Sequence, residues 1–172
     1  EKAGVNFTYV VPGKGTIRGD LAWGGNWFFL TSLPKELSLE IVLCEAMRLT
    51  TQAMIMRTKL SQLGYPEVDH IELFAPPRDP ANHSRNFVLC PGKAYDRSPC
   101  GTGNSAKLAC LIADGKLTPG EVWRQESILG RLCKATGTVV GKKVIPRITG
   151  TAFSTSEAAL LVEAGDPFAS GF

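Results

Sequence analysis

The residue best suited to chemistry in this chain is Cys100, in the run DRSPCGTG at residues 96–103. The glycines after it lack a Cβ atom, so the backbone can approach a ligand closely. The helix expected next leaves its first N–H groups unpaired and its N-terminus partly positive, which favours a bound carboxylate. The same field should favour the thiolate of Cys100 over the thiol. The run predicts a thiol that exchanges protons with a small anion.

An isolated cysteine is more often a structural core residue than a catalytic one. Here two glycines, a helix start and the carboxylate of Asp96 coincide around Cys100, and this favours a functional site. Asp96, four residues before the thiol, is placed to receive a substrate ammonium group or to orient the turn. The other cysteines lack this setting and are expected to be core or neutral residues; they are Cys44, Cys90, Cys110 and Cys133.

Short strands and two helices must position this run. Thr50 is expected to cap a helix that ends near Leu63, with Gly64 just beyond it. A second helix, over about residues 103–114, is apolar nearly all round, which predicts burial on every side. β-branched and aromatic residues between Gly and Pro turns predict most of the strands. The strand at residues 37–43 is predicted from the alternation of Leu39, Ile41 and Leu43 on one face. The expected strands are residues 5–11, 15–22, 26–32, 37–43, 70–75, 86–90, 121–129, 132–140, 144–149 and 158–163.

The elements predict an α+β fold in which a curled, mostly antiparallel, barrel-like sheet wraps a central helix. A chain of 172 residues has room for one domain, or for one and a small extension. Hydrophobic residues make up 44% and charged residues 20%, which is typical of a soluble globular protein.

Composition argues against several functional classes. The net charge is only +3 and no basic stripe is present, so a nucleic-acid partner is not expected. No apolar run reaches membrane-spanning length and no signal peptide is visible, so no membrane partner is expected. The five cysteines are odd in number and lack C-x-x-C spacing, which favours reduced thiols and a cytoplasmic location.

The order of motifs along the chain resembles the proline racemase and hydroxyproline epimerase family. The run DRSPCGTGNSA at residues 96–106 is similar to the family's second catalytic motif. The AWGGNWF block and SAK at 105–107 are more similar to 4-hydroxyproline 2-epimerases than to proline racemases. Further matches, in the same order, are DLAWGGNWF at 20–28, DHIE at 69–72, residues 85–93 and 113–117, QESI at 125–128 and DPF at 166–168.

The resemblance implies a fold like diaminopimelate epimerase, with two similar halves and a small-molecule substrate between them. Each half offers one cysteine at the start of its central helix, and neither a metal nor a pyridoxal cofactor is needed. Cys100 would be one of the two acid/bases. Gly101 and Thr102 would bind the substrate carboxylate through the backbone, and Asp96 and His70 would contact its amine or ring.

Three departures from the family pattern matter. Asn104 stands where the family usually has Thr, and Arg131 where it usually has Ser. The family's first motif, a Cys-Gly-His-Gly turn, is absent. We therefore expect residues 1–150 to be the second half-domain and residues 151–172 a tail that packs on a first half outside this chain. An exposed apolar face is expected there, through which the chain could form a homodimer.

The resulting hypothesis is a cofactor-independent epimerase acting at the α-carbon of 4-hydroxyproline or proline, inactive as this chain alone. One alternative is a lyase that dehydrates trans-3-hydroxyproline. Relatives of that class carry Thr at the second cysteine position, so Cys100 argues against it. The other alternative is a non-catalytic half-domain that only holds a carboxylate.

Overall fold

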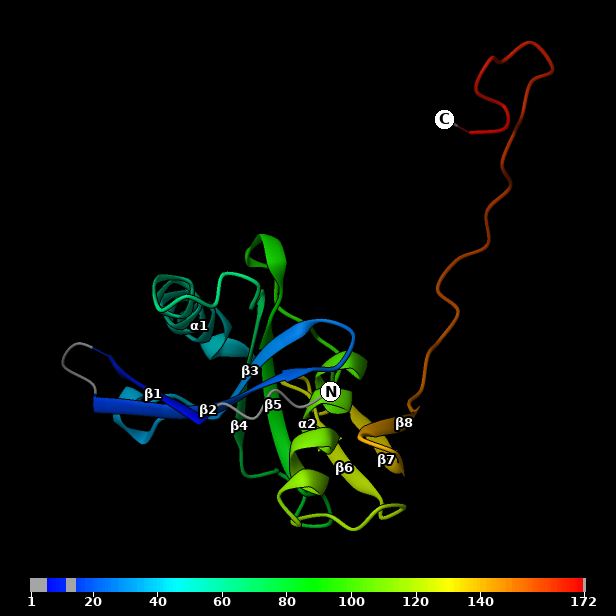
Figure 1. Cartoon of the computed structure of the whole chain (residues 1–172). Helices are drawn as coiled ribbons and strands as arrows, with labels where there is room; N and C mark the ends of the chain where they lie inside the picture. The colour runs from blue at the N-terminus through cyan, green and yellow to red at the C-terminus, as the bar shows by residue number, and fades with distance from the viewer. Residues whose placement is uncertain (1–5, 12–14, 172) are drawn as a thin grey trace.

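A single eight-stranded sheet organises the protein, and its spatial order follows the chain from β1 to β8 (Figure 1). The computed structural model describes residues 6–11 and 15–171. Residue 5 of the first expected strand lies outside the described residues. The strands are β1 (Asn6–Val11), β2 (Gly15–Trp23), β3 (Trp27–Ser32), β4 (His70–Ala75), β5 (Ser84–Leu89), β6 (Trp123–Glu126), β7 (Leu132–Val140) and β8 (Lys143–Thr149).

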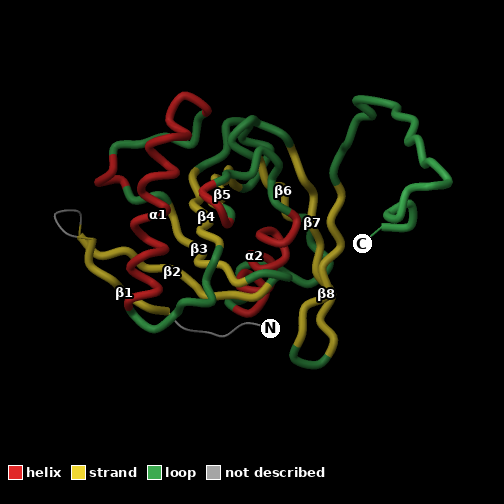
Figure 2. Tube along the Cα trace, turned by 90° about the horizontal axis from the view of Figure 1, so that it is seen from above, coloured by secondary structure: helices red, strands yellow, loops and turns green. Residues whose placement is uncertain are grey.

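The two long helices lie on opposite faces of the sheet (Figure 2). Among the described strands, β3–β4 and β5–β6 pair in parallel and the other neighbours pair antiparallel. Parallel neighbours need crossovers, which α1 (Ala46–Gln62) and α2 (Gly101–Ala113) provide. Each crossover leads to the next strand in the same direction across the sheet, from β3 to β4 and from β5 to β6. The second pair of strands runs opposite to the first, because β5 is antiparallel to β4. Because such crossovers are right-handed, the helices fall on opposite faces.

The apolar stripe of α1 covers one face. Its buried residues recur three and four positions apart, as one face of a helix requires; they are Ala46, Leu49, Ala53, Met56 and Leu60. Alternate side chains along a strand reach opposite faces. Thus Phe29 and Ile71 pack with the α1 cluster, whereas Phe28 and Phe74 pack in the cluster that holds Cys100.

The second helix, α2, is the central helix that the sheet curls around. It contacts β2 and β3 on one side and β7 and β8 on the other. Leu108 and Ala106 are completely buried, in two separate clusters of the α2 side. The expectation of an α+β fold with a mostly antiparallel sheet and a central helix is therefore confirmed. The helix is not buried on every side, because Ser105, Leu111 and Ile112 are only partly buried.

Three expected elements differ in the structure. Residues 37–43 form no strand. An irregular segment lies there between two 3-10 helices, η1 (Lys35–Leu37) and η2 (Leu43–Glu45). Leu37, Leu39 and Ile41 pack into the α1 core without a strand partner, whereas Leu43 is 54% exposed. The alternating apolar pattern of this segment therefore reflects burial and not strand pairing. Helix α1 begins at Ala46, and Thr50 lies inside it, where its hydroxyl donates to the Ala46 carbonyl. Residues 158–163 are extended and exposed, with no strand partner.

The chain leaves the body after β8, and residues 150–171 are exposed along their whole length (Figure 1). Apolar side chains in this tail include Phe153, Leu160 and Leu161, each more than 75% exposed. The assignment of residues 1–150 as a second half-domain stays a prediction, as does the homodimer.

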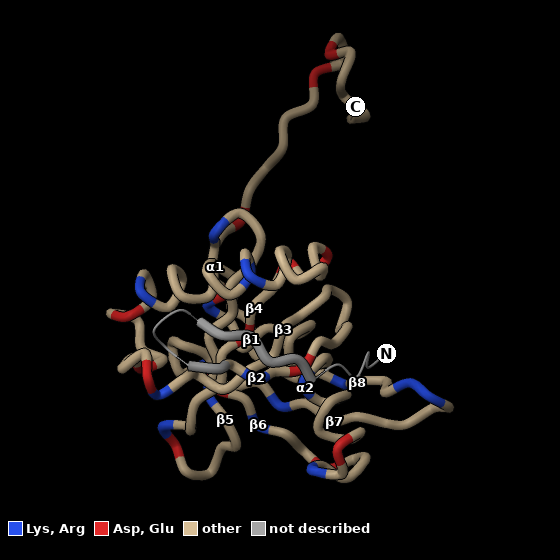
Figure 3. Tube along the Cα trace, turned by 60° about the vertical axis from the view of Figure 1, so that its left-hand side comes forward, with Lys and Arg blue, Asp and Glu red and all other residues tan. Residues whose placement is uncertain are grey.

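Charged side chains are spread over the described part of the molecule. Figure 3 shows lysines, arginines and carboxylates distributed over many elements. No helix within residues 6–11 and 15–171 is long and apolar enough to span a membrane. All five cysteines are free thiols, and the cytoplasmic location stays a prediction.

Candidate active site at the start of helix α2

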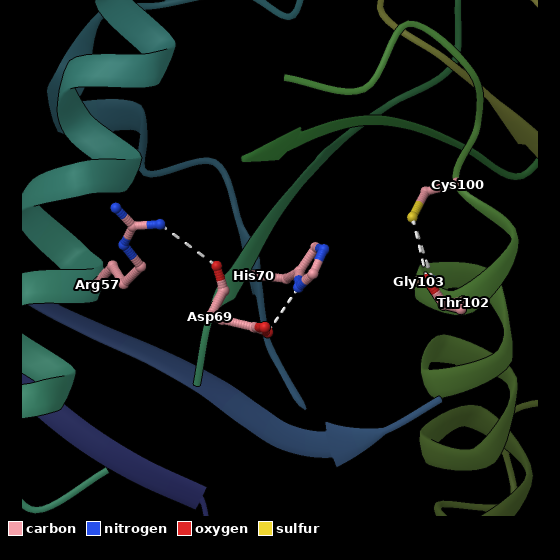
Figure 4. A network of polar contacts seen from close by, with 6 residues as sticks. All are labelled: Arg57, Asp69, His70, Cys100, Thr102 and Gly103. Carbon is pink, nitrogen blue, oxygen red and sulfur yellow. Dashed lines mark hydrogen bonds and ion pairs between the residues drawn. The ribbon is translucent and has the colours of Figure 1, made fainter. Parts of the chain in front are cut away.

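The Cys100 side chain caps the N-terminus of α2. Its Sγ atom accepts a hydrogen bond from the Gly103 N–H at 3.4 Å and lies 3.6 Å from the Thr102 hydroxyl (Figure 4). The residue is only 6% exposed. The first helical N–H groups, those of Gly101 and Thr102, have no acceptor within the helix. The thiol and two backbone donors that lack an acceptor within the helix therefore lie at the same helix end, as the sequence predicts.

The backbone at Cys100 adopts a conformation that side chains rarely take, with φ 60° and ψ 106°. Several hydrogen bonds hold it. The Pro99 carbonyl accepts from the side-chain amides of Asn86, at 2.9 Å, and Asn104, at 2.6 Å. The Cys100 N–H donates to the Ser98 hydroxyl at 3.1 Å. Such strained positions cluster at functional sites, where surrounding contacts hold them.

This strain predicts a difference between two variants that both remove the thiol. Cys100→Ala keeps a Cβ at a positive φ, whereas Cys100→Gly does not. We expect the glycine variant to have the larger free energy of unfolding, by about 1 kcal/mol, since strain of this kind costs about 1–3 kcal/mol. Urea unfolding of the two proteins measures the difference. Equal stabilities, or a more stable alanine variant, would show that the backbone there is unstrained.

Asp96 orients the turn that leads to Cys100. Its Oδ1 accepts a hydrogen bond from the Ser98 N–H at 2.8 Å, and Ser98 in turn accepts from the Cys100 N–H. This is one of the two roles expected from its position. The other role, contact with a substrate amine, stays a prediction.

His70 begins β4 on the face of the sheet that packs against α2. Its ring lies 4.7 Å from the Phe28 ring, and Phe28 belongs to the same cluster as Cys100. Its Nδ1 contacts Asp69 Oδ1 at 2.6 Å, which leaves Nε2 for another partner. Figure 4 shows the ring extending from β4 toward the side where α2 begins. The fold thus brings His70 and Cys100 to one face from 30 positions apart.

Two buried polar residues under the helix start were not singled out from the sequence. Glu72 on β4 is completely buried, and its Oε1 accepts a 2.7 Å hydrogen bond from the Asn86 amide on β5. Its Oε2 is buried without a hydrogen-bond partner in the described residues. A carboxylate between the apolar residues Ile71 and Leu73 of the strand was the signal that could have identified it.

Gly24 and Gly25, in the loop after β2, also lie against this helix end. A Cβ on Gly24 would come within 2.1 Å of the Thr102 carbonyl oxygen and 2.6 Å of the Ala106 nitrogen. Glycine is required there for close approach. Trp23, the last residue of β2, is 43% exposed.

The protonation of Cys100 is opposite to the sequence expectation. Burial, and then the neighbouring Glu72 carboxyl group, raise the pKa of the thiol from 9.0 to about 12. The hydrogen bond from the Gly103 N–H lowers it, but by less. The expectation of a favoured thiolate considered only the helix field and omitted these larger effects. In this structure Cys100 is a thiol at neutral pH.

A pocket of about 380 Å³ opens onto Cys100 and Gly101. Its charged lining residues are Arg97 and Arg131, both exposed. The departure at Arg131 therefore faces the cleft. The remaining walls are largely apolar and include Leu129, Leu132, Ile148 and Phe153. A small ligand with an anionic group suits this lining.

A larger pocket of about 810 Å³ lies elsewhere, beside Phe74 and Lys107, and does not include Cys100. The reactive thiol and the helix N–H groups border the smaller pocket instead. We therefore locate the candidate site at the smaller pocket, which contains the thiol that could transfer a proton.

Comparison with known proteins gives consistent relatives. The family model described as proline racemase matches residues 3–172. A 4-hydroxyproline 2-epimerase from Roseibium alexandrii is 52% identical over 172 residues, covering 95% of this chain and 51% of the relative. A 4-hydroxyproline 2-epimerase from Pseudomonas fluorescens is 51% identical over 166 residues, covering 94% of this chain and 52% of the relative.

Solved structures agree with the sequence matches. A hydroxyproline epimerase from Agrobacterium vitis, crystallised with bound trans-4-hydroxy-L-proline, superposes with a TM-score of 0.80 at 31% identity, covering 99% of this chain and 52% of that chain. A probable proline racemase from Agrobacterium radiobacter, with bound carbonate, gives a TM-score of 0.80 at 29% identity, covering 99% and 54%. The chain spans about half the length of the relatives it matches. By motif, fold and sequence, the chain belongs to the proline racemase family.

Proposed function

We propose that this chain carries one acid/base half of a cofactor-independent isomerase that epimerises 4-hydroxyproline at its α-carbon. The observation that carries the proposal is the Cys100 thiol capping α2, beside unpaired helix N–H groups and a pocket with two arginines. High identity to 4-hydroxyproline 2-epimerases supports the substrate class. A two-half arrangement like that of diaminopimelate epimerase is part of the proposal.

In the proposed reaction, two thiols act on opposite faces of the substrate. A thiolate from the other half removes the α-proton, and the Cys100 thiol gives a proton to the opposite face. The raised pKa of Cys100 suits the resting donor role, because the group holds its proton until the carbanion forms. In the reverse direction the two thiols exchange these roles.

The developing negative charge spreads onto the substrate carboxylate. The backbone N–H groups of Gly101 and Thr102, together with the positive end of α2, are placed to stabilise it. Removing one donor of this kind costs about 2.7–4 kcal/mol of transition-state stabilisation in other enzymes. Asp96 and His70 are proposed to contact the amine or the ring.

The test joins this chain to the part of the Roseibium alexandrii relative that it does not match. We expect the fusion to convert trans-4-hydroxy-L-proline to its 2-epimer, and the chain alone to give no turnover, because one thiol cannot serve both faces. Chiral chromatography of the product measures both. The family's first cysteine, which the added segment is expected to supply, is then replaced by serine as the matched control.

Each result decides between the functional classes. Robust turnover by the chain alone contradicts the proposed division between two halves. A folded fusion that forms a pyrroline carboxylate from trans-3-hydroxyproline, and no epimer, favours the lyase. A folded fusion that binds pyrrole-2-carboxylate without turnover favours a non-catalytic carboxylate-binding module.

A further inference from the structure

Glu72 is a buried ionisable residue that lies close to Cys100. It is completely buried on β4, between Leu30 of β3 and Val88 of β5 in the sheet register. Its Oε1 has a single donor, the Asn86 amide, and its Oε2 has none among the described residues. An ionised carboxylate normally takes several donors, so one hydrogen bond leaves its charge poorly compensated.

Geometry places the free oxygen beside the thiol. If Gly103 carried a Cβ atom, that atom would lie 2.4 Å from Glu72 Oε2 and 3.2 Å from Cys100 Sγ. Both atoms therefore border one small space, which exists because residue 103 is glycine. The gap is closed to solvent on the Glu72 side, since that side chain is fully buried.

We propose that Glu72 is a positioning residue for Cys100, supporting the thiolate while it is a neutral acid and opposing it as a carboxylate. The inference rests on the proposed role of Cys100 as an acid/base. When Cys100 gives its proton to the substrate, a neutral Glu72 leaves the new thiolate free of an adjacent like charge. The space they border accommodates one negative charge more easily than two.

The charged and titratable groups around Glu72 are consistent with this. Burial, chiefly, raises the pKa of Glu72 to about 8, while the Asn86 hydrogen bond and then Lys107 lower it. Lys107 on α2 lies over the Phe74 ring at 4.0 Å and makes no direct ion pair with Glu72. The titratable groups in this environment are Lys107 of α2 and, before that helix, Cys90, Asp96 and Cys100. Lys107 is in turn influenced by Cys110, Asp20 and Lys116.

The test measures alkylation of Cys100 by iodoacetamide in the chain and in its Glu72→Gln variant. Glutamine keeps the shape and the Asn86 contact but cannot ionise. At about pH 7, where Glu72 is mostly neutral, we expect similar rates in both proteins. At about pH 10 we expect the variant to react about tenfold faster, the effect of one pKa unit on the thiolate fraction.

Peptide mass spectrometry follows each cysteine separately, so Cys44 serves as a control in the same samples. Cys44 is exposed and should react at the same rate in both proteins at every pH. A variant-to-wild-type ratio for Cys100 that stays constant with pH overturns the proposal, because a merely structural change alters the rate equally throughout.

A second measurement needs no variant and covers the case in which Glu72→Gln does not fold. A lone thiol below its pKa reacts about tenfold faster per pH unit. In the unmodified chain we expect this rise to flatten near pH 8, where Glu72 ionises. An unbroken tenfold rise through this range contradicts the proposal. Alkylation requires no turnover, so either result is independent of whether the fusion epimerises hydroxyproline.

Discussion

Replacing Cys100 with serine in the active fusion is expected to lower kcat/KM for epimerisation by about 10²–10⁴-fold, the usual contribution of a general acid/base. A serine hydroxyl holds its proton far more tightly than a thiol, so it cannot protonate the carbanion at a useful rate. The substitution removes no large contact, because the side chains are similar in size. The fold should therefore persist, which circular dichroism and urea unfolding check.

The control for this substitution is Cys44→Ser, which makes the same chemical change at an exposed position. It should leave kcat/KM unchanged. A further readout separates the two proton transfers: in deuterated water, Cys100→Ser should still allow the other thiol to exchange the α-proton of one isomer without inverting it. A Cys100→Ser fusion with nearly full epimerase activity would remove Cys100 from the mechanism.

Replacing Gly103 with alanine is expected to damage both stability and catalysis. The new Cβ would lie 2.4 Å from Glu72 Oε2 and 3.2 Å from Cys100 Sγ, and Glu72 is enclosed on all sides. Overpacking of this kind typically costs about 1–3 kcal/mol of unfolding free energy. Displacement of the thiol by even about 1 Å is expected to lower kcat/KM of the fusion about 10²-fold.

Gly101→Ala is the matched control, because it makes the same change in the same helix where nothing lies within 4 Å of the new atom. Its stability should equal or exceed that of the unmodified chain, since alanine is the better helix former. Glu72→Asp, which shortens the clashing side chain, should recover part of the stability lost by Gly103→Ala. If Gly103→Ala is as stable as Gly101→Ala, then Gly103, Glu72 and Cys100 do not pack closely enough to exclude a Cβ atom.

The sequence predicted the elements that local patterns define. The apolar pattern near residues 103–114 predicted the central helix, and β-branched and aromatic residues between turns predicted most of the strands. The segment 37–43 was an exception, because alternating burial and strand pairing produce the same pattern. Strand pairing depends on a second strand that is a neighbour in space, and the local sequence carries no information about that neighbour.

The sequence by itself determined that Cys100 stands on a glycine turn at the start of a helix, since the run at residues 96–103 is contiguous. Only the tertiary structure decided its protonation. Burial outweighs the local helix field and keeps the thiol protonated, and Glu72, a residue 28 positions earlier in the chain, raises the pKa of the thiol further when it is ionised. Helix fields and turns act between neighbours in sequence, whereas desolvation and charge repulsion act through space, and the fold alone brings those groups together.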